Sequence, residues 1–514
     1  MRLRLLILSL ALGAAAPAAL AAQARPTGML ARRIAPLFRG RGWRHAQWGA
    51  LVVSLTRGDT LFSYHADQRF LPASNAKLFT TAAALHYLGT DFRFLTILFA
   101  DGSVAHDTLR GSLVLYGTGD PTFGLDTASL APFADSVVRA GIRVVEGDVV
   151  GDASFLGAEL TGPGWLPDNL DQAYAAPPSA LGAAANRVRI TVEPGDTTGA
   201  PALITVDPPT DYFHVTSTVT TGRWRSRTRI RVEREDSVGG TVALGGVISP
   251  LRSEWRTEIV VRDPAAFAAS LLRQGLAARG VTVTGATRAV TDDPPGRASL
   301  LLARAEGGGR ERGGGGGPFA GAIAVRESPP LGDLVTEINH RSDNLSAELV
   351  FRSVGRAVGG AGSFASGADA VARFLSADAG ILPESVRISD GSGLSVDDEA
   401  TPRALIQLLA YERRAPAAER DAFWRSLPEP GDGLGRRMTG TAAEGRLRAK
   451  TGTMSDVSAL TGYVTTAGGE ELAFSIVVND MVRIRRARQA QDRMGVLLAR
   501  LDRGDLQGAE ATGR

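Results

Sequence analysis

Cysteine is absent from this chain, and lysine nearly so. Only Lys77 and Lys450 occur among the 57 basic residues of the 514-residue sequence. The missing thiols exclude a disulfide framework, a cysteine nucleophile and a cysteine-based metal site. Every other basic residue is arginine, which stays protonated in proteins, whereas lysine can lose its proton in a suitable site. The two lysines are therefore candidates for chemistry that arginine cannot perform.

An excess of either charge is also missing, and so are long apolar runs after the first residues. The formal net charge is +3, which gives no reason to expect a nucleic-acid partner. Arg2 and Arg4 precede an apolar run over 5–20, and Ala19-Leu20-Ala21 fits a cleavage site, with Ala22-Gln23-Ala24 as a second option. We expect residues 1–24 to be a signal peptide, with an uncleaved membrane anchor as the alternative. The mature protein is then exported, periplasmic or extracytoplasmic, without a transmembrane segment.

The apolar periodicity predicts a mixed α and β protein. Strands are expected at 50–55 and 60–64, and at 460–466 and 471–478 as a hairpin, with helices at 74–88, 264–279, 331–339, 345–358 and 484–501. From about residue 92 to about 305, short Val/Thr/Ile-rich runs alternate with turn residues, which predicts one or two mostly β insertions. Gly307–Gly317 is glycine-rich and predicts a linker or surface loop.

Ser74-Asn75-Ala76-Lys77 places a serine and a lysine three residues apart at the predicted start of a helix. Residues at this spacing lie on one helix face, so the amine of Lys77 can reach the hydroxyl of Ser74. A neutral Lys77 could then take the proton of Ser74 during nucleophilic attack. The partial positive charge of the helix N-terminus favours the alkoxide.

Ser342-Asp343-Asn344 separates two predicted helices. A hydroxyl such as that of Ser342 can relay a proton to a leaving amine, and the amide of Asn344 can both donate to and accept from a peptide bond. The alternative is a structural one, in which Ser342 or Asp343 caps the helix that follows.

Lys450-Thr451-Gly452-Thr453 precedes the C-terminal hairpin and is expected on or beside an edge strand. The glycine lets the strand backbone approach a ligand closely, and the two threonine hydroxyls and the Lys450 charge suit a carboxylate. Lys450 should also lower the pKa of Lys77 by repulsion. The alternative is an ordinary turn with an exposed lysine.

The three motifs occur in the order S-x-x-K, S-x-N, K-T-G, and the only two lysines occupy its two lysine positions. This set is typical of penicillin-binding proteins and class A β-lactamases. The chain resembles the low-molecular-mass class C penicillin-binding proteins, which are D-alanyl-D-alanine carboxypeptidases and endopeptidases of the penicillin-binding protein 4 type. Further segments carry the resemblance: 115–121, 147–155, 163–165 and 390–395. Residues 427–433 match as well, but the Leu-Gly-Arg that follows departs from the family pattern.

The resemblance implies an α+β fold, in which a penicillin-binding transpeptidase domain, an antiparallel sheet flanked by helices, is interrupted by a mostly β region of one or two domains. The more than 260 residues between Lys77 and Ser342 fit this architecture. The expected divisions are a transpeptidase domain at 25–95 and 325–503, an inserted domain II at 96–160 and 242–305, an inserted domain III at 161–241, a Gly-rich loop at 306–324 and a flexible tail at 504–514.

The resemblance also implies the role of each site residue. Ser74 is the acylated nucleophile, Lys77 its base, Ser342 the proton donor to the departing D-alanine, and Asn344 the contact to the acyl-side amide. Lys450, Thr451, Gly452 and Thr453 form the carboxylate-binding strand, with the oxyanion held by the backbone N–H groups of Ser74 and Thr453. Asp152 would bind the amino end of a diaminopimelate side chain, and Met454 would line that pocket, although a turn aspartate and a structural methionine are the plain alternatives.

The implied substrates are peptidoglycan stem peptides, with β-lactam antibiotics as covalent inhibitors and with no cofactor or metal. A serine β-lactamase is one alternative, but it needs a base for the deacylating water, and none can be assigned. A non-catalytic cell-wall-binding relative is the other, and the complete motif set argues against it.

Overall fold

The computed structural model describes residues 28–38, 43, 45–125, 129–235, 240–292, 322–481 and 483–503. The predicted signal peptide and the predicted C-terminal tail lie outside the described residues, as do residues 306–321 of the predicted Gly-rich loop. Residues 322–324 of that loop are instead the beginning of a strand.

One end of the molecule is built on a five-stranded antiparallel sheet with the strand order β19-β20-β21-β1-β2. Its strands are β1 (Gln47–Ser54), β2 (Thr60–Tyr64), β19 (Leu447–Thr453), β20 (Ser458–Thr465) and β21 (Glu471–Asn479). Both faces of β1 are buried: Trp48, Ala50 and Val52 pack into one core and Leu51 and Val53 into another. A strand covered on both sides reads as an unbroken apolar run, which is why the sequence Ala-Leu-Val-Val appears here.

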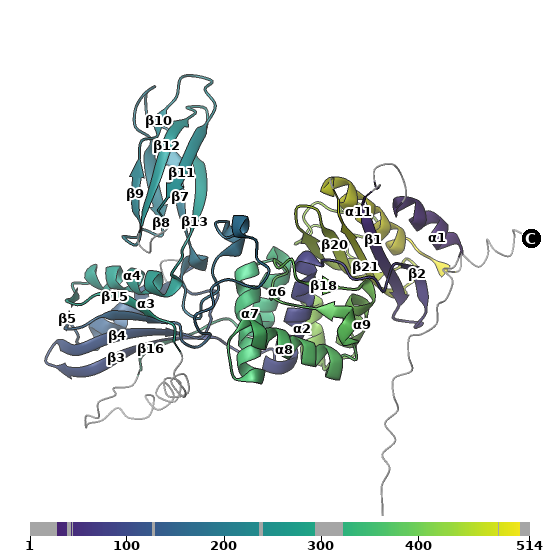
Figure 1. Cartoon of the computed structure of the whole chain (residues 1–514), viewed down its shortest axis with the longest axis horizontal. Coiled ribbons are helices and arrows are strands. Elements are labelled where there is room, and N and C mark those ends of the chain that lie inside the picture. The colour runs from purple at the N-terminus through teal and green to yellow at the C-terminus, as the bar shows by residue number, and fades with distance from the viewer. Residues whose placement is uncertain are drawn as a thin grey trace, which may run out of the picture.

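Helices cover the two faces of this sheet (Figure 1). One face is packed against α1 (Gly28–Ile34) and α11 (Ile484–Ala499). The other supports a helical layer that forms the middle of the molecule: α2 (Ala76–Leu88), α6 (Leu331–Arg341), α7 (Asn344–Gly359), α8 (Phe364–Arg373), α9 (Pro402–Glu412) and α10 (Ala417–Ser426). The helices predicted from apolar periodicity are confirmed within a few residues, except that residues 74 and 75 lie in a 3₁₀ turn before α2.

The chain between α2 and α6 forms a second body at the opposite end (Figure 1). A seven-stranded sheet is covered by α3 (Ala131–Arg139) and α4 (Pro264–Ala277). Its strands are β3 (Leu95–Ala105), β4 (Thr108–Gly117), β5 (Val144–Val145), β6 (Val149–Asp152), β14 (Thr282–Val283), β15 (Thr287–Val290) and β16 (Ala322–Glu327).

An outer lobe, which comprises β7 to β13 (Arg187–Val260), stands away from this body and is coloured teal in Figure 1. One small sheet contains β7 (Arg187–Glu193), β8 (Leu203–Asp207) and β13 (Trp255–Val260). The other contains β9 (His214–Ser217), β10 (Thr220–Thr221), β11 (Arg229–Arg234) and β12 (Thr241–Ile248). The chain enters and leaves the lobe side by side, since Val261 N donates to Asn186 O at 2.8 Å.

Short elements complete the fold. They are the two-residue strands β17 (Val386–Arg387) and β18 (Glu399–Ala400), a π-helical turn at Phe374–Asp378, and 3₁₀ turns at Ala35–Phe38, Ala73–Asn75, Pro167–Asn169, Ala173–Ala175, Ala184–Asn186 and Pro383–Ser385.

Strand pairing bears on where the inserted domains begin and end. The expected boundary at 241/242 falls after the first residue of β12 and divides the rest of β12 from β11, yet these two strands pair antiparallel along their length. Likewise β16, which reaches Glu327, pairs with β3 of the inserted sheet, whereas the transpeptidase domain was expected to resume at 325. We propose that the outer lobe runs from 187 to 260 and that the transpeptidase domain resumes after 327. Strand pairing decides these bounds, and local composition does not reveal it.

Candidate active site

A strained turn presents Ser74 at the start of α2. Ala73, the residue before it, has a φ of 47°, a left-handed conformation that a residue with a side chain rarely adopts. The next residue, Asn75, is fully buried, and its Nδ2 donates to Thr461 Oγ1 on β20 at 2.8 Å. The turn is thereby fastened to the sheet, and Ser74 is left partly accessible. Such strain persists only where surrounding structure imposes it, and it is concentrated at functional sites.

Lys77 lies beneath this serine and is completely buried. Its Nζ is 3.2 Å from Ser74 Oγ, as the three-residue spacing on a helix predicts. Nζ also donates to Asn344 Oδ1 at 2.6 Å and to the carbonyl oxygen of Ser392 at 2.7 Å. The amine therefore has three oxygen neighbours from three separate parts of the chain.

Ser342 and Asn344 come from the corner between α6 and α7. Ser342 ends α6 with a φ of 55°, and Asp343 caps α7 by accepting from Ser346 N at 3.0 Å. The structural alternative for this motif is thus correct for Asp343. It does not compete with a chemical role for its neighbours, because the left-handed corner and the cap together direct Ser342 and Asn344 toward the two lysines.

Lys450 lies on the edge strand β19 and is also completely buried. Its Nζ donates to Ser342 Oγ at 2.9 Å and to the carbonyl oxygen of Thr451 at 2.9 Å. A Cβ atom at Gly452 would lie 2.6 Å from Pro72 O and 3.2 Å from Ala73 Cβ. Glycine is therefore required here, because β19 passes directly against the turn that carries Ser74. The exposed-turn alternative for this motif is incorrect.

Burial lowers the pKa of both lysines. The pKa of Lys77 falls to about 8, first because desolvation disfavours the ammonium, while the carboxylates of Glu348 and Asp390 oppose this effect. The pKa of Lys450 is lowered well below its usual value by burial and then by the charge of Lys77. We expected repulsion from Lys450 to be the cause at Lys77. Burial is the main cause instead, and the repulsion is seen at Lys450.

Three buried acids lie behind Lys77. The pKa of Glu348 is raised to about 8 by burial and then by the charge of Asp390, and the pKa of Asp398 is raised well above its usual value for the same two reasons. Glu348 Oε2 accepts from Gly391 N at 2.7 Å, and Asp390 Oδ1 accepts from Gly393 N at 2.7 Å. These carboxyl groups hold the 391–393 loop, whose Ser392 carbonyl contacts Lys77. None of the three was a predicted site residue.

A segment of the inserted region also reaches the site. Tyr174, just before the outer lobe, accepts through its carbonyl oxygen from Asn344 Nδ2 at 2.8 Å. Trp165 donates from Nε1 to Asp390 Oδ2 at 2.8 Å. Segments 163–165 and 390–395 were singled out in the sequence without roles. The only signal in the sequence was that both segments resemble segments of the same family. This resemblance did not indicate that the two segments contact each other.

The remaining predicted site residues fall into two groups. Thr451 is half-buried, Thr453 is exposed and Met454 is half-buried, so all three lie at the accessible end of β19. Arg488 from α11 donates to Thr453 Oγ1 at 3.0 Å, which brings a second cation to this end. Asp152 lies elsewhere, on β6 of the inserted sheet, where it is fully buried and accepts from Ser154 N at 3.0 Å.

In the part of the chain that the structure describes, no three histidine or acidic side chains are arranged to hold a metal ion. Across the same described ranges, every helix is too short or too polar to cross a bilayer.

Comparison with known proteins places the chain in a family. A model of the D-Ala-D-Ala carboxypeptidase 3 (S13) family matches residues 38–305 and 319–501. A D-alanyl-D-alanine carboxypeptidase of Actinomadura sp. (strain R39) is 32% identical over 487 residues, which cover 90% of this chain and 85% of that protein. D-alanyl-D-alanine carboxypeptidase DacB of Haemophilus influenzae is 24% identical over 437 residues, 84% of this chain and 85% of that protein.

The crystal structure of penicillin binding protein 4 (dacB) from Haemophilus influenzae superposes with a TM-score of 0.76 at 22% identity, covering 92% of this chain and 99% of that one. This match confirms the predicted α+β fold, in which a sheet-and-helix domain is interrupted by inserted strands.

Proposed function

This chain belongs to the D-Ala-D-Ala carboxypeptidase 3 (S13) family, and we propose that it is a serine-type peptidase that cleaves D-Ala-D-Ala-type bonds through an acyl-enzyme on Ser74. The observation that carries this proposal is the contact between Ser74 Oγ and a fully buried lysine amine at 3.2 Å. A serine hydroxyl becomes a nucleophile when a neighbouring base can accept its proton. A lysine with a pKa of about 8 is partly neutral near physiological pH and can serve as that base.

In the acylation step, Ser74 Oγ attacks the carbonyl carbon of the peptide bond and Lys77 takes the hydroxyl proton. The C–N bond then breaks, and the Ser342 hydroxyl gives its proton to the departing amine. Lys450, 2.9 Å from Ser342 Oγ, stabilises the oxygen that remains. Lys77 then passes to Ser342 the proton that it took from Ser74, so that both groups regain their initial protonation states. In the second step, water attacks the ester carbon and gives a proton to Lys77, the ester C–O bond breaks, and Lys77 passes this proton to Ser74 Oγ, which restores the hydroxyl and releases the carboxylic acid. No group outside the substrate and water is consumed.

The accessible end of β19 suits the terminal carboxylate of the substrate. The Thr451 and Thr453 hydroxyls, the Lys450 amine and the Arg488 guanidinium supply donors there. A bound carboxylate would raise the lowered pKa of Lys450, so that the substrate itself restores the ammonium. The backbone N–H groups of Ser74 and Thr453 would stabilise the oxyanion, an effect typically of about 3 kcal/mol per donor.

Asn344 is suited to hold the acyl-side amide, because one end of its side chain is fixed by Lys77 and the other by the Tyr174 carbonyl. Asp152 and Met454 are proposed contacts for the side chain of a diamino acid in the substrate. Asp152 is shielded from solvent, so a direct contact requires neighbouring segments to move. The accessible location of Met454 next to Thr453 makes it the better supported of the two.

We further propose peptidoglycan stem peptides as substrates, β-lactam antibiotics as covalent inhibitors that acylate Ser74, and an exported location after removal of residues 1–24. The first two follow from the family and from the serine-lysine pair, and the third from the N-terminal sequence pattern.

A direct test uses a pentapeptide that ends in D-Ala-D-Ala and a cross-linked peptide dimer, with products identified by mass spectrometry. Wild type should release D-alanine or cleave the cross-link, and it should be labelled by fluorescent penicillin. Ser74→Ala should do neither, whereas Ser376→Ala, which changes an exposed serine in the π-helical turn Phe374–Asp378, should behave as wild type. Equal absence of label in wild type and Ser74→Ala would contradict the proposal. Rapid turnover of a chromogenic cephalosporin would point to a β-lactamase instead.

A further inference from the structure

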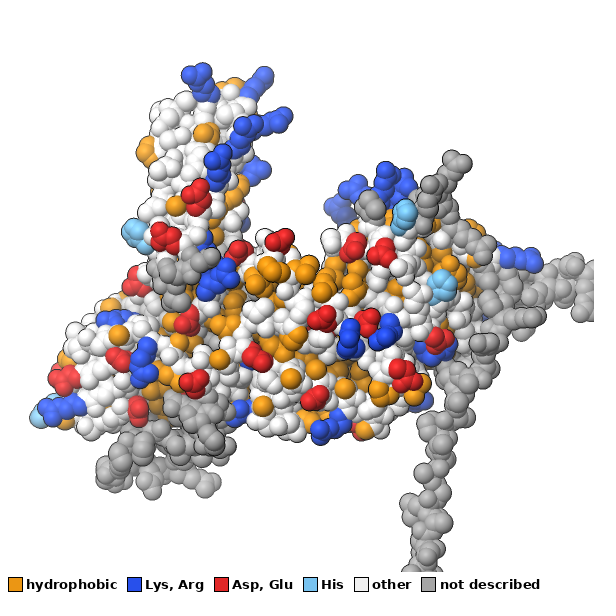
Figure 2. Space-filling model, viewed as in Figure 1, with side chains coloured by type: hydrophobic (Ala, Val, Ile, Leu, Met, Phe, Trp, Pro, Cys, Tyr) orange, Lys and Arg blue, Asp and Glu red, His pale blue; other side chains and the backbone are white. Residues whose placement is uncertain are grey.

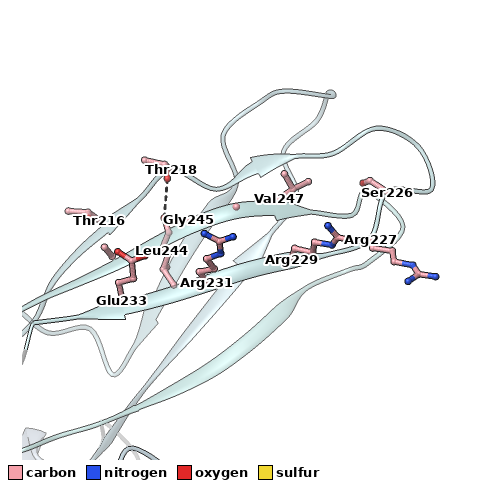
Figure 3. A pocket seen from close by; sticks show the side chains of 12 residues that line it. Thr216, Thr218, Ser226, Arg227, Arg229, Arg231, Glu233, Leu244, Gly245 and Val247 are labelled. Carbon is pink, nitrogen blue, oxygen red and sulfur yellow. Dashed lines mark hydrogen bonds between the residues drawn. The ribbon is translucent and has the colours of Figure 1, made fainter.

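The outer lobe carries a hollow of about 720 Å³ that is remote from Ser74 (Figure 3). It lies on the face of β11, β12 and β9 and on the turn before β11. Arg227, Arg229 and Arg231 follow one another along this turn and strand, as Figure 3 shows. Gly245 and Gly246 contribute no side chain to the opposite strand, which leaves the space beside the arginines open.

These three residues continue a longer basic row. Arg223, Arg225, Arg227, Arg229 and Arg231 occupy every second position and are all exposed. Among the described residues, none of the five side chains makes an ion pair or a hydrogen bond. Figure 2 shows blue side chains gathered toward the free end of the lobe, with red ones nearer its base. Elsewhere in the molecule arginines are commonly paired, as Arg403 is with Asp67 and Arg413 with Glu471.

Protection of a sheet edge is the simplest structural explanation for such a row. Within the described sheet β11 pairs only with β12, and charged side chains on an edge strand prevent further strand pairing. This explanation covers Arg229 and Arg231. It does not cover Arg223, Arg225 and Arg227, which precede the strand where no ladder edge is exposed. Repulsion within a row of like charges is unfavourable, so a partner of opposite charge from outside the chain would stabilise it.

We propose that the row Arg227, Arg229 and Arg231, with the hollow beside it, binds a linear phosphodiester polymer. Alternate residues of a strand are separated by about 6.6 Å, so the charges of Arg229 and Arg231 recur at a spacing that suits successive anionic groups of an extended chain. The guanidinium fork matches phosphate oxygens with two hydrogen bonds. The hydroxyls of Thr216 and Thr218 on the other side of the hollow can bind the polar backbone between the phosphates.

The shape and charge of the lobe favour a polymer over a flat anionic bilayer. The arginines line a hollow on the face of the sheet, whereas a flat bilayer would contact the tip of the lobe. Trp224, which is 71% exposed in the turn before β11, is an aromatic side chain that suits a lipid interface. It does not line the hollow, so its replacement separates the two possibilities.

The test measures binding of a fluorescently labelled poly(glycerol phosphate) oligomer to the full chain by anisotropy at several salt concentrations. In Arg227→Ser/Arg229→Thr/Arg231→Thr we expect Kd at low salt to rise by about tenfold or more, and the slope of log Kd against log salt to fall by about two to three. The matched control is Arg436→Ser/Arg446→Ser/Arg500→Ser, which removes three exposed arginines at the other end of the molecule. The control should retain wild-type Kd, and both variants should hydrolyse a short D-Ala-D-Ala peptide as wild type does.

Equal Kd values for wild type and the lobe variant would overturn the proposal, as would an equal loss in the control. Monomeric glycerol phosphate that competes as well as the oligomer, phosphate for phosphate, would show a single-anion site instead of a polymer site. Binding to phosphatidylglycerol vesicles that is lost in Trp224→Ala, without binding to the oligomer, would assign the row to a membrane surface. Retained peptide hydrolysis in the lobe variant keeps all these outcomes separate from those that test Ser74.

Discussion

The candidate active site and the outer lobe differ in the burial and pairing of their basic side chains. We call the first the reaction centre; it comprises Ser74, Lys77, Ser342 and Lys450. In the reaction centre, the two cations are fully buried, each with oxygen neighbours within 3.2 Å. In the outer lobe, five arginines lie exposed without a partner in the described structure. A buried lysine can change its protonation state, whereas an exposed arginine can only attract. The difference is consistent with the presence of lysine at the two positions beside Ser74 and Ser342, where a change of protonation state would be useful.

Replacement of each buried lysine by arginine gives the strongest test of this difference between the two regions. In Lys77→Arg the charge is retained and the base is lost, so acylation by penicillin should fall on the order of a thousandfold. In Lys450→Arg the rate of acylation should fall much less, because we expect the positive charge at position 450 to matter more than proton transfer by this residue. The rate of labelling by fluorescent penicillin checks both, with circular dichroism to verify folding. Equal losses in the two variants would mean that the shape of lysine, and not its proton, matters at both positions.

The pH dependence of acylation follows from the lowered pKa of Lys77. Because the neutral amine is the active form, the rate should rise with pH, reach half its maximum near pH 8, and fall about tenfold per unit below that value. Stopped-flow measurements with penicillin test this directly. A rate that is flat between pH 6 and pH 9 would exclude Lys77 as the base, since no titration would then control the step.

The scarcity of lysine allows the two amines to be observed separately. A sample grown with lysine labelled at ¹³Cε should give only two lysine signals, which Lys450→Arg assigns. We expect both to titrate below the usual range of exposed lysine, with Lys77 near pH 8. A pKa above 10 for either signal would contradict the claim that burial governs the reaction centre.

A smaller effect on acylation is expected from changing Trp165, through which the inserted region contacts the Asp390 loop behind Lys77. Trp165→Phe removes the hydrogen bond from Nε1 to Asp390, which should lower the free energy of unfolding by about 1 kcal/mol and slow acylation several-fold. Trp424→Phe is the control, because Trp424 packs on Arg413 and Arg448, neither of which is among the residues proposed for the site. It should affect stability only. Unchanged acylation in Trp165→Phe would show that the Asp390 loop needs no support from the insertion.

The smallest predicted effect concerns a buried acid outside both regions. Glu412 ends α9, and neither of its carboxyl oxygens has a hydrogen-bond partner among the described residues. Burial and then Glu419 raise its pKa well above the usual 4.5. The folded state thus retains a proton that the unfolded chain releases, so this stability is present below pH 4.5 and is lost as pH rises. Glu412→Gln should therefore be more stable than wild type at pH 8 by about 1 kcal/mol, and equally stable at pH 4. Thermal unfolding at the two pH values measures this.

Local patterns predicted what depends on local geometry. The contact between Ser74 and Lys77 follows from a three-residue spacing on a helix, and the edge-strand location of Lys450 follows from its place before a hairpin. The capping role of Asp343 was also readable from its place between two helices. Residues such as Glu348 and Tyr174 were not identified, because nothing near them in the sequence distinguishes a buried acid or a carbonyl that will meet Asn344.

The sequence by itself determined five of the helices, the four strands predicted at 50–55, 60–64, 460–466 and 471–478, and the family resemblance, because these depend on periodicity, spacing and side-chain chemistry. The helices α1, α3, α8, α9 and α10 were not predicted. Tertiary structure alone decided that Lys450 meets Ser342 across 108 positions, and that burial, more than mutual repulsion, lowers the pKa of Lys77. Both depend on which distant segments pack together and exclude water from the lysine amines. The spacing of residues along the sequence does not show this packing.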